Sequence, residues 1–248
     1  MAKKVEDKKE EVDDRPTYFI HDPFDTQILY RNMMEKRGYK RELKQREADF
    51  VLFTGGPDIH PFLYGETRHD KTFPSLTRDR DDIRILRNCS DSRGQVKIGI
   101  CRGAQFLNVM VANGTMYQHV DGHDKGYHDA SDSEGNIIRV SSTHHQQMIP
   151  GPNAKIILKA AETTKWEADC WFWDVDASKG EKNNWDDPEV IYYPEENMLC
   201  FQPHPEFEDP ENQACQEFFF LALEEHFLSS KQIEALDKYI ANRKKKVA

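Results

Sequence analysis

The sequence of 248 residues contains no long apolar run. A helix that crosses a bilayer needs roughly 20 consecutive apolar residues, and no stretch of this chain approaches that length. The N-terminal stretch also lacks the apolar segment of a secretory signal peptide. These absences predict a cytoplasmic protein without a membrane partner.

Cysteine is scarce: the chain has five, an odd number, scattered without Cys-x-x-Cys spacing. This pattern favours reduced thiols over a disulfide framework or a zinc site. One of them, Cys101, stands out by the glycines on both sides of it. The others are predicted to be packing residues: Cys89, Cys170, Cys200 and Cys215.

Positive charge is also in short supply, because 44 acidic residues outnumber 34 lysines and arginines and leave a formal net charge of −10. Phosphate binding needs a basic face, so we expect no nucleic-acid partner. The cluster Lys244–Lys246 is too small to change this and is expected to lie in a solvated tail. The length suits one well-buried α/β domain.

The most informative stretch is Val96–Met110. Valine and isoleucine alternate with small or polar residues up to Ile100, which predicts a buried strand. No helix breaker then occurs between Gly103 and Asn113, which predicts a helix. Cys101 therefore stands on a strand-to-helix turn.

Glycines on both sides of Cys101 permit the strained backbone of a nucleophile elbow. The positive end of the following helix favours the thiolate form of a cysteine at such a place. A structural cysteine in an α/β core would show the same local pattern. This segment by itself leaves both interpretations open.

A second motif favours the catalytic interpretation. The apolar run Met198–Phe201 is followed by His204 and Glu206. In an extended segment, residues two positions apart face the same way, so Glu206 can orient the His204 ring toward a thiol. Pro203 and Pro205 on either side of the histidine stiffen the pair.

These motifs resemble the class I glutamine amidotransferase superfamily, through Gly-Ile-Cys-Arg-Gly-Ala-Gln at 99–105 and Gln-Pro-His-Pro-Glu at 202–206. Within it the chain looks most like the γ-glutamyl hydrolase branch, the C26 peptidases, which includes γ-glutamyl-GABA hydrolases. Thr-Gly-Gly-Pro-Asp at 54–58 with Tyr-Gly-Glu at 64–66, and Ser-Thr-His-His-Gln at 142–146, support that branch. The resemblance runs from about Thr17 to Phe227.

The resemblance implies a Cys101, His204 and Glu206 triad that cleaves a γ-glutamyl amide bond through a thioester, without a metal or an organic cofactor. It also implies that the backbone N–H groups of Gly56 and Arg102 form an oxyanion hole. Seen alone, the segment around Gly56 is typical of an ordinary Gly-Pro-Asp turn. Its place before the elbow favours the functional interpretation.

Three further residues are implied to contact the γ-glutamyl substrate: Gln105, His144 and Gln146. Two departures from the family pattern stand close to them. Ala104 replaces a larger residue, which bears on the shape of the pocket, and Ser141 replaces an asparagine, which bears on one hydrogen bond. The segment at 140–146 could also be a polar strand end.

A histidine-rich segment follows the elbow helix, and its acidic and imidazole side chains could suggest a metal site: His119, Asp121, His123, Asp124, His128 and Asp129. Gly122 and Gly126 favour a loop here, in which these side chains would not share a face. We therefore expect a solvated loop at the mouth of the active site and no metal.

The order of elements predicts a three-layer α/β/α domain with a mainly parallel central sheet, as in class I glutamine amidotransferases. Strands are expected at 17–20, 50–53, 96–100, 154–160, around 166–173, 189–193 and 198–202. Helices are expected at about 25–37, 78–89 and 211–228, the second as a capped surface helix, with an insertion loop at 174–188. The predicted domains are a charged tail at 1–15, the catalytic domain at 16–228, and a peripheral helix with a basic tail at 229–248.

Three functions are consistent with these motifs. The first is a stand-alone hydrolase of small γ-glutamyl conjugates, and the second is a glutaminase subunit that supplies ammonia to a separate synthase. The third is a binding or regulatory protein with weak catalysis. The sequence does not name the amine leaving group, and it leaves homo-oligomerisation open.

Overall fold

The computed structural model describes residues 13–21, 27–89, 94–120, 122–124, 126–161 and 187–247. Most of the predicted charged tail lies outside the described residues. The strand expected around 166–173 and all but the last two residues of the loop expected at 174–188 lie outside them as well.

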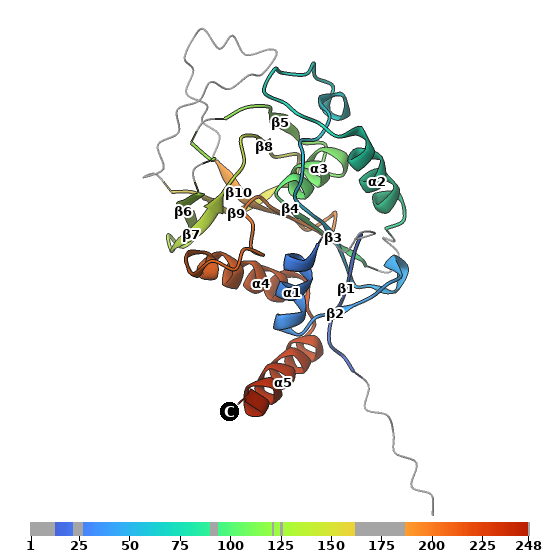
Figure 1. Cartoon of the computed structure of the whole chain (residues 1–248), viewed down its shortest axis with the longest axis vertical. Helices are drawn as coiled ribbons and strands as arrows, with labels where there is room; N and C mark the ends of the chain where they lie inside the picture. Colours follow the sequence, from blue (N-terminus) through green and yellow to red (C-terminus); the bar gives the residue numbers. More distant parts are fainter. Residues whose placement is uncertain are drawn as a thin grey trace, which may run out of the picture.

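A nine-stranded sheet in the order β2-β1-β3-β4-β11-β10-β9-β6-β7 forms the centre of the molecule (Figure 1). Its strands are β1 Thr17–Ile20, β2 Lys40–Arg41, β3 Phe50–Phe53, β4 Val96–Ile100, β6 Gly126–Asp132, β7 Ile137–Ser142, β9 Lys155–Ala160, β10 Pro188–Tyr193 and β11 Met198–Phe201. The half from β2 to β11 is parallel, and the pairs from β11 to β7 are antiparallel. A separate antiparallel pair joins β5 Thr115–Tyr117 to β8 Gln147–Ile149.

Helices cover both faces of this sheet, which confirms the predicted α/β/α class. They are α1 Ile28–Arg37, α2 Leu76–Arg87, α3 Arg102–Met110, α4 Gln213–Phe227 and α5 Ser230–Val247, with short 3-10 turns at Gln45–Glu47, Pro61–Tyr64 and Pro210–Asn212. In Figure 1, α2 and α3 lie on one side of the sheet and α1 and α4 on the other. Gly38 ends α1 with φ 108°, as its place in the sequence predicts.

The period-two alternation of the strands builds two separate cores. Phe50 and Leu52 of β3 pack with α1 and α4, whereas Val51 and Phe53 pack with α2 and α3. Since every residue of β3 is buried, the unbroken apolar run marks a strand covered on both faces.

The β10–β11 hairpin delivers the second motif to the first. Asn197, with φ 51°, lies in the turn before β11, and β11 then pairs in parallel with β4 so that Phe201 lies beside Ile100. Carboxyl ends of neighbouring parallel strands meet at one edge of a sheet. The residues after Phe201 and after Ile100 therefore come together.

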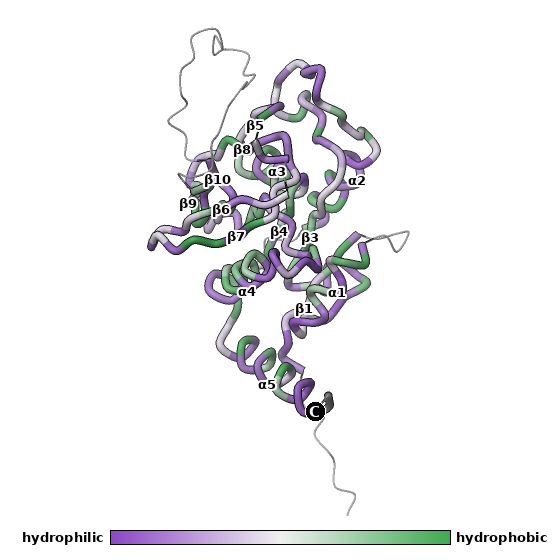
Figure 2. Tube along the Cα trace, turned by 60° about the vertical axis from the view of Figure 1, so that its left-hand side comes forward, coloured by the Kyte–Doolittle hydropathy of each residue, from purple (hydrophilic) through white to green (hydrophobic). Residues whose placement is uncertain are grey.

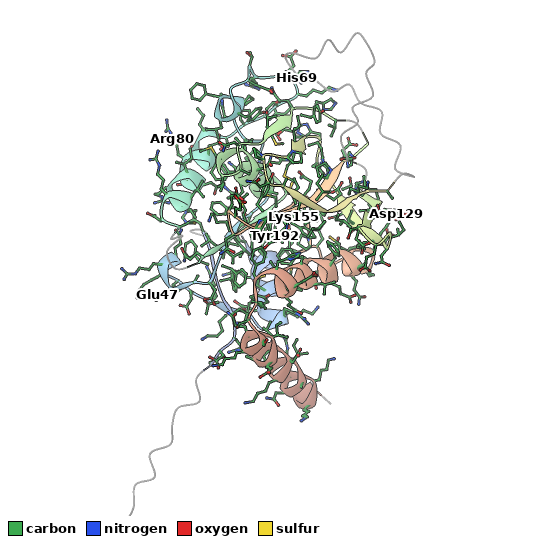
Figure 3. All side chains as sticks on the ribbon, turned by 180° about the vertical axis from the view of Figure 1, so that it is seen from behind. Glu47, His69, Arg80, Asp129, Lys155 and Tyr192 are labelled. Atoms are coloured by element: carbon green, nitrogen blue, oxygen red, sulfur yellow. The ribbon has the colours of Figure 1, made fainter. Side chains whose placement is uncertain are left out.

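Helix α5 lies at the opposite end of the molecule from α3 (Figure 1). Its C-terminal part is hydrophilic (Figure 2), and the Lys244–Lys246 cluster continues the helix instead of forming a separate tail. On the paired strands β9 and β10, Lys155 lies opposite Tyr192, and the two side chains lie side by side in Figure 3. Among the described residues, no helix combines the length and apolar character that crossing a membrane requires.

Two expectations about surface position are wrong. Helix α2 is capped, by Ser75, and begins at Leu76, two residues before the expected start at Arg78. Its Asp79 and Asp82, however, are each only 3% exposed because they pair with Arg102 of α3. The histidine-rich segment is not a solvated loop either, since His119, His123 and His128 are buried and β6 begins at Gly126. Both elements pack against partners distant in the sequence, which local composition does not reveal.

Candidate active site

Cys101 occupies a strained turn between β4 and α3. Its φ of 51° and ψ of −114° place a residue with a β-carbon in a sparsely populated backbone region. The Cys101 N–H donates a 2.8 Å hydrogen bond to the carbonyl oxygen of Phe201 at the end of β11. Strain of this kind, about 1–3 kcal/mol, persists only where surrounding contacts enforce it, and it is common at active sites.

Gly99 and Gly103 make this turn sterically feasible. A β-carbon at Gly99 would lie 2.4 Å from the backbone nitrogen of Ala104, and one at Gly103 would lie 2.0 Å from the carbonyl oxygen of Phe53. Both positions require glycine because α3 lies directly against the strands. The glycines on both sides of Cys101 in the sequence thus correspond to a close approach of α3 to β3 and β4.

The second motif meets Cys101 here. His204 Nδ1 lies 2.6 Å from Glu206 Oε1, which leaves Nε2 as the ring nitrogen for the thiol. Burial by itself would lower the pKa of His204, but the charge and hydrogen bond of Cys101 and the Glu206 carboxylate outweigh it and raise that pKa to about 10. The raised pKa favours a protonated imidazole beside the Cys101 side chain.

Other contacts fix the backbone and ring of His204. The His204 N–H donates to Ser141 Oγ at 2.7 Å, and Asn212 Nδ2 donates to the His204 carbonyl at 2.7 Å. Phe207 stacks on the imidazole with ring centroids 4.6 Å apart. Ser141, the departure from the family pattern, therefore holds the peptide of the histidine.

Tyr30 of α1 also belongs to the site, although no sequence motif indicated it. Its hydroxyl accepts a 3.0 Å hydrogen bond from the Gly55 N–H. Burial, and after it the charge of Glu206, holds the pKa of Tyr30 well above its ordinary value. Gly55 must stay a glycine, because a β-carbon would lie 2.8 Å from His204 Cε1.

The loop after β3 carries the predicted oxyanion donor, and Arg78 of α2 holds it. Arg78 Nη2 donates to the Thr54 carbonyl at 3.0 Å, and Nη1 donates to the Gly55 carbonyl at 3.4 Å. In a planar trans peptide the C=O and the following N–H point in opposite directions. Since the Gly55 carbonyl turns toward Arg78, the Gly56 N–H turns away from it. Gly56 has φ 151°, which favours glycine.

Arg102, the other predicted donor, begins α3, where a backbone N–H has no acceptor within its own helix. Its side chain is 1% exposed and is paired with Asp79 at 2.5 Å and with Asp82. Asp82 also accepts from Arg78 Nε at 3.1 Å. One buried network thus joins both predicted oxyanion segments to α2.

A pocket of about 280 Å³ opens beside Cys101, near the lower end of the range for small-molecule sites. It gathers Cys101 with every predicted oxyanion and substrate residue: Gly56, Arg102, Gln105, His144 and Gln146. Ala104 is fully buried in the core on the α3 side of the sheet, so this departure does not line the pocket.

Each predicted substrate residue has one polar side-chain atom hydrogen-bonded within the protein. Gln105 Nε2 donates to Gln202 Oε1 at 3.2 Å, and Gln146 Nε2 donates to the Gln118 carbonyl at 3.1 Å. His144 Nδ1 lies 3.0 Å from the Gln146 carbonyl. Burial, and after it the nearby His123, holds the pKa of His144 well below its ordinary range, so this ring is neutral.

Asp58 and His145 line the pocket as well, and sequence reasoning assigned neither of them to the site. Their side chains lie 3.2 Å apart, and this hydrogen bond to Asp58 raises the pKa of His145. The Phe73 N–H donates to the other Asp58 oxygen at 2.7 Å. The pair of adjacent histidines was the one sequence signal for His145. The two side chains have different partners, Asp58 for His145 and the Gln146 carbonyl for His144, and only the structure distinguishes them.

Family comparison agrees with this geometry. The family model of Peptidase C26 matches residues 42–165, half of the chain, and covers Gly56, Cys101 and His144. A protein named glutamine amidotransferase Rv2859c, from Mycobacterium tuberculosis, is 41% identical over 71 residues, 28% of this chain and 22% of that protein. The glutamine amidotransferase-like YvdE homolog of Lactococcus lactis subsp. cremoris is 38% identical over 74 residues, 29% of this chain and 37% of that protein.

Solved structures show the same fold at low sequence identity. A glutamine amidotransferase from Thermotoga maritima superimposes with a TM-score of 0.52 at 11% identity, over 92% of each chain. A chain of PurLQS from Thermotoga maritima gives a TM-score of 0.52 at 17% identity, over 83% of this chain and 99% of the other.

The matched segments span only about a fifth to two fifths of the curated relatives, so those relatives do not define the activity of the whole chain. The family match, the fold and the elbow nevertheless agree. This chain belongs to the Peptidase C26 family of the class I glutamine amidotransferase-like superfamily.

Proposed function

We propose that this protein is a cysteine-dependent amidohydrolase that cleaves the γ-glutamyl amide bond of glutamine or of a small γ-glutamyl conjugate. The observation that carries the proposal is the strained backbone of Cys101 beside a histidine held at 2.6 Å by a buried glutamate. An ordinary core cysteine needs neither feature.

In the first half of the reaction, the Cys101 thiolate attacks the γ-carbonyl carbon. Negative charge moves to the carbonyl oxygen, where the N–H groups of Gly56 and Arg102 would each lower the barrier by about 3 kcal/mol. His204 gives its proton to the departing nitrogen, so that ammonia or an amine leaves and a thioester remains.

In the second half, His204 takes a proton from water, and the resulting hydroxide attacks the thioester carbonyl. The same two N–H groups receive the second oxyanion. The carbon–sulfur bond breaks, glutamate leaves and Cys101 returns to its starting form. Throughout the cycle, Glu206 orients the imidazole and stabilises its positive charge.

The pocket lining supports a γ-glutamyl substrate, whose free end carries an ammonium and a carboxylate. Asp58 supplies a carboxylate suited to the ammonium, and His145 beside it supplies a cationic partner for the substrate carboxylate. A site of about 280 Å³ accepts a compact amino acid group more readily than a peptide.

The test is glutamate release from glutamine and from a panel of γ-glutamyl amines. The Cys101→Ala variant should lose at least about 10⁴-fold in kcat, while Cys89→Ala, a change to a cysteine that does not line the pocket, should retain normal rates. Preference for a γ-glutamyl amine over glutamine would identify a stand-alone hydrolase. Equal rates for wild type and Cys101→Ala would overturn the proposal.

The fold shared with a protein named as a GMP synthase component, from Thermoplasma acidophilum, favours a second candidate, a glutaminase that passes ammonia to a synthase. That structure superimposes with a TM-score of 0.51 over 93% of this chain and 98% of the other, at 14% identity. Glutamine turnover that rises when a copurifying partner is added would support it. No turnover with any substrate, in a folded protein, would favour a binding role instead.

A further inference from the structure

Four buried side chains converge behind the wall of the pocket. His123 and His144 lie in segments before β6 and after β7, His128 lies on β6, and Glu189 lies on β10. The histidines are 0%, 4% and 7% exposed in the order His123, His144 and His128, and Glu189 is 0% exposed. Asp129, the next residue on β6, points outward (Figure 3) and pairs with Arg139 of the edge strand β7 instead.

The strand β10 has an irregularity that re-aims Glu189. Pro188 pairs with Lys159 and Val190 with Leu158, so Glu189 is an extra residue relative to β9. Bulges of this kind turn a side chain away from its regular direction and are common next to functional sites. Here the carboxylate is turned into the protein interior, where burying a charge is costly unless a cation meets it.

The ligand atoms lie at metal-binding separations. Glu189 Oε1 is 3.5 Å from His123 Nδ1 and 3.0 Å from His128 Nε2, and Glu189 Oε2 is 3.9 Å from His144 Nε2. The donor atoms of His123, His144 and Glu189 all lie within 4.8 Å of one another. Ligands held about 2.0–2.1 Å from a tetrahedral zinc ion are separated by about 3.3 Å, so small side-chain movements suffice.

Hydrogen bonds on the far side of two of the imidazole rings orient their other nitrogen toward Glu189. His144 Nδ1 lies 3.0 Å from the Gln146 carbonyl, which places a proton on Nδ1 and directs Nε2 at Glu189. His123 Nε2 lies 2.8 Å from Asp187 Oδ2, which likewise directs Nδ1 at Glu189. A carbonyl or carboxylate on the second nitrogen is the usual support of a metal-ligating histidine. Within the described part of the chain, His144 Nε2 and both Glu189 oxygens make no hydrogen bond.

We propose that His123, His144 and Glu189, with His128 as the fourth donor, bind one divalent transition metal ion of the zinc type. Nitrogen and carboxylate donors in a tetrahedral set suit zinc. Four protein ligands close the coordination sphere, so the ion is structural and activates no water. It joins β6 and β10 to the pocket wall that carries His144, and the Glu189 carbonyl accepts from the Gln202 N–H at 2.8 Å, two residues before His204.

The test uses the full chain without a histidine tag, stripped with a chelator, reloaded with zinc alone and desalted. We expect about one zinc per chain and a higher Tm in the loaded protein than in the stripped protein, because a ligand that binds only the folded state stabilises it. Glu189→Gln should lose both the zinc and the shift in Tm. Asp187→Asn, which removes an outer contact, should bind zinc about 10- to 100-fold more weakly.

His145→Gln is the matched control, because His145 is adjacent to His144 but pairs with Asp58. It should keep the zinc and the shift in Tm. Should Glu189→Gln fail to fold, cobalt loading of the wild type replaces it, since a tetrahedral site gives intense visible absorption and an adventitious surface ion does not. No zinc after desalting, or equal zinc in Glu189→Gln and His145→Gln, would show that protons alone bridge this cluster. Neither outcome affects the amidohydrolase proposal.

Discussion

At the scale of single residues, the site depends on side chains that do not contact Cys101 themselves but hold the groups beside it. Glu206 and Ser141 hold His204, and Arg78 holds the peptides that aim the Gly56 N–H. Each positioning residue can be removed while Cys101 remains intact, so their contributions can be measured separately from the loss of the nucleophile.

Glu206→Gln should lower kcat by about 10²–10⁴-fold, within the range for a misaligned general acid–base group. Because the Glu206 charge helps to raise the pKa of His204 to about 10, its removal lowers that pKa. The alkaline limb of the kcat/KM profile should therefore move to lower pH. Glu208→Gln, an exposed neighbour, is the control, and an unmoved limb in Glu206→Gln would contradict the assigned role.

Arg78→Met should reduce kcat by about 10²-fold with little change in KM, because one oxyanion donor loses its orientation. Arg80→Met, on the exposed side of the same helix (Figure 3), controls for the loss of charge. Steady-state kinetics separates the two constants. A rise in KM at unchanged kcat would instead place Arg78 in substrate binding.

At the scale of elements, the close approach of α3 to β3 and β4 sets the position of Cys101, the proposed nucleophile. The approach depends on glycine at two places in the elbow, and the Arg102 pairs with Asp79 and Asp82 join α3 to α2 on its outer side. Breaking such a buried ion pair leaves an uncompensated charge, which costs about 3–5 kcal/mol.

Gly103→Ala should destabilise the protein by about 3 kcal/mol, the upper end for overpacking, because its β-carbon would lie 2.0 Å from the Phe53 carbonyl oxygen. Gly135→Ala is the comparison: it has φ 86° but no atom within 4 Å of the added carbon. Urea unfolding of both variants measures the difference. A loss at Gly103→Ala no larger than that at Gly135→Ala would contradict the clash with Phe53.

At the scale of the whole molecule, the pocket beside Cys101 and the last helix are separate. The described residues that line the pocket include none from α5. Helix α5 contacts the core on the α1 and α4 side of the sheet through Leu236, which is 1% exposed, and its Tyr239 ring packs near Gly38. The pocket is lined by Gln105 of α3 and by residues of the loops after β3 and β7. Stability and catalysis should therefore separate for changes in α5.

Leu236→Ala should lower the free energy of unfolding by about 2–5 kcal/mol, the range for truncating a buried leucine. The kcat/KM for glutamate release should stay at the wild-type value at temperatures where the variant is folded. Chemical denaturation and kinetics on the same preparation check both statements. A drop in kcat/KM without loss of stability would reveal coupling between α5 and the pocket.

Features that depend on local chemistry could be predicted from the order of residues. Gly99 and Gly103 indicate the elbow because only glycine allows the backbone approach, and the His204–Glu206 spacing puts both side chains on one face of an extended segment. The turn at 194–197 and the helix end at Gly38 follow from short-range backbone preferences. These residues suffice to predict the fold class and to gather the motifs at one sheet edge.

The groups that the sequence did not predict are those whose partners lie far along the chain. From the sequence, Asp79 and Asp82 look like exposed residues at the start of a helix. In the structure they are buried and paired with Arg102. Tyr30 lies in no recognisable motif. His123 and His128 look like loop residues in the sequence, but in the structure the bulge at Glu189 turns its carboxylate toward them. Burial and pairing of charge depend on packing between distant segments, and a local pattern of residue types does not contain that information.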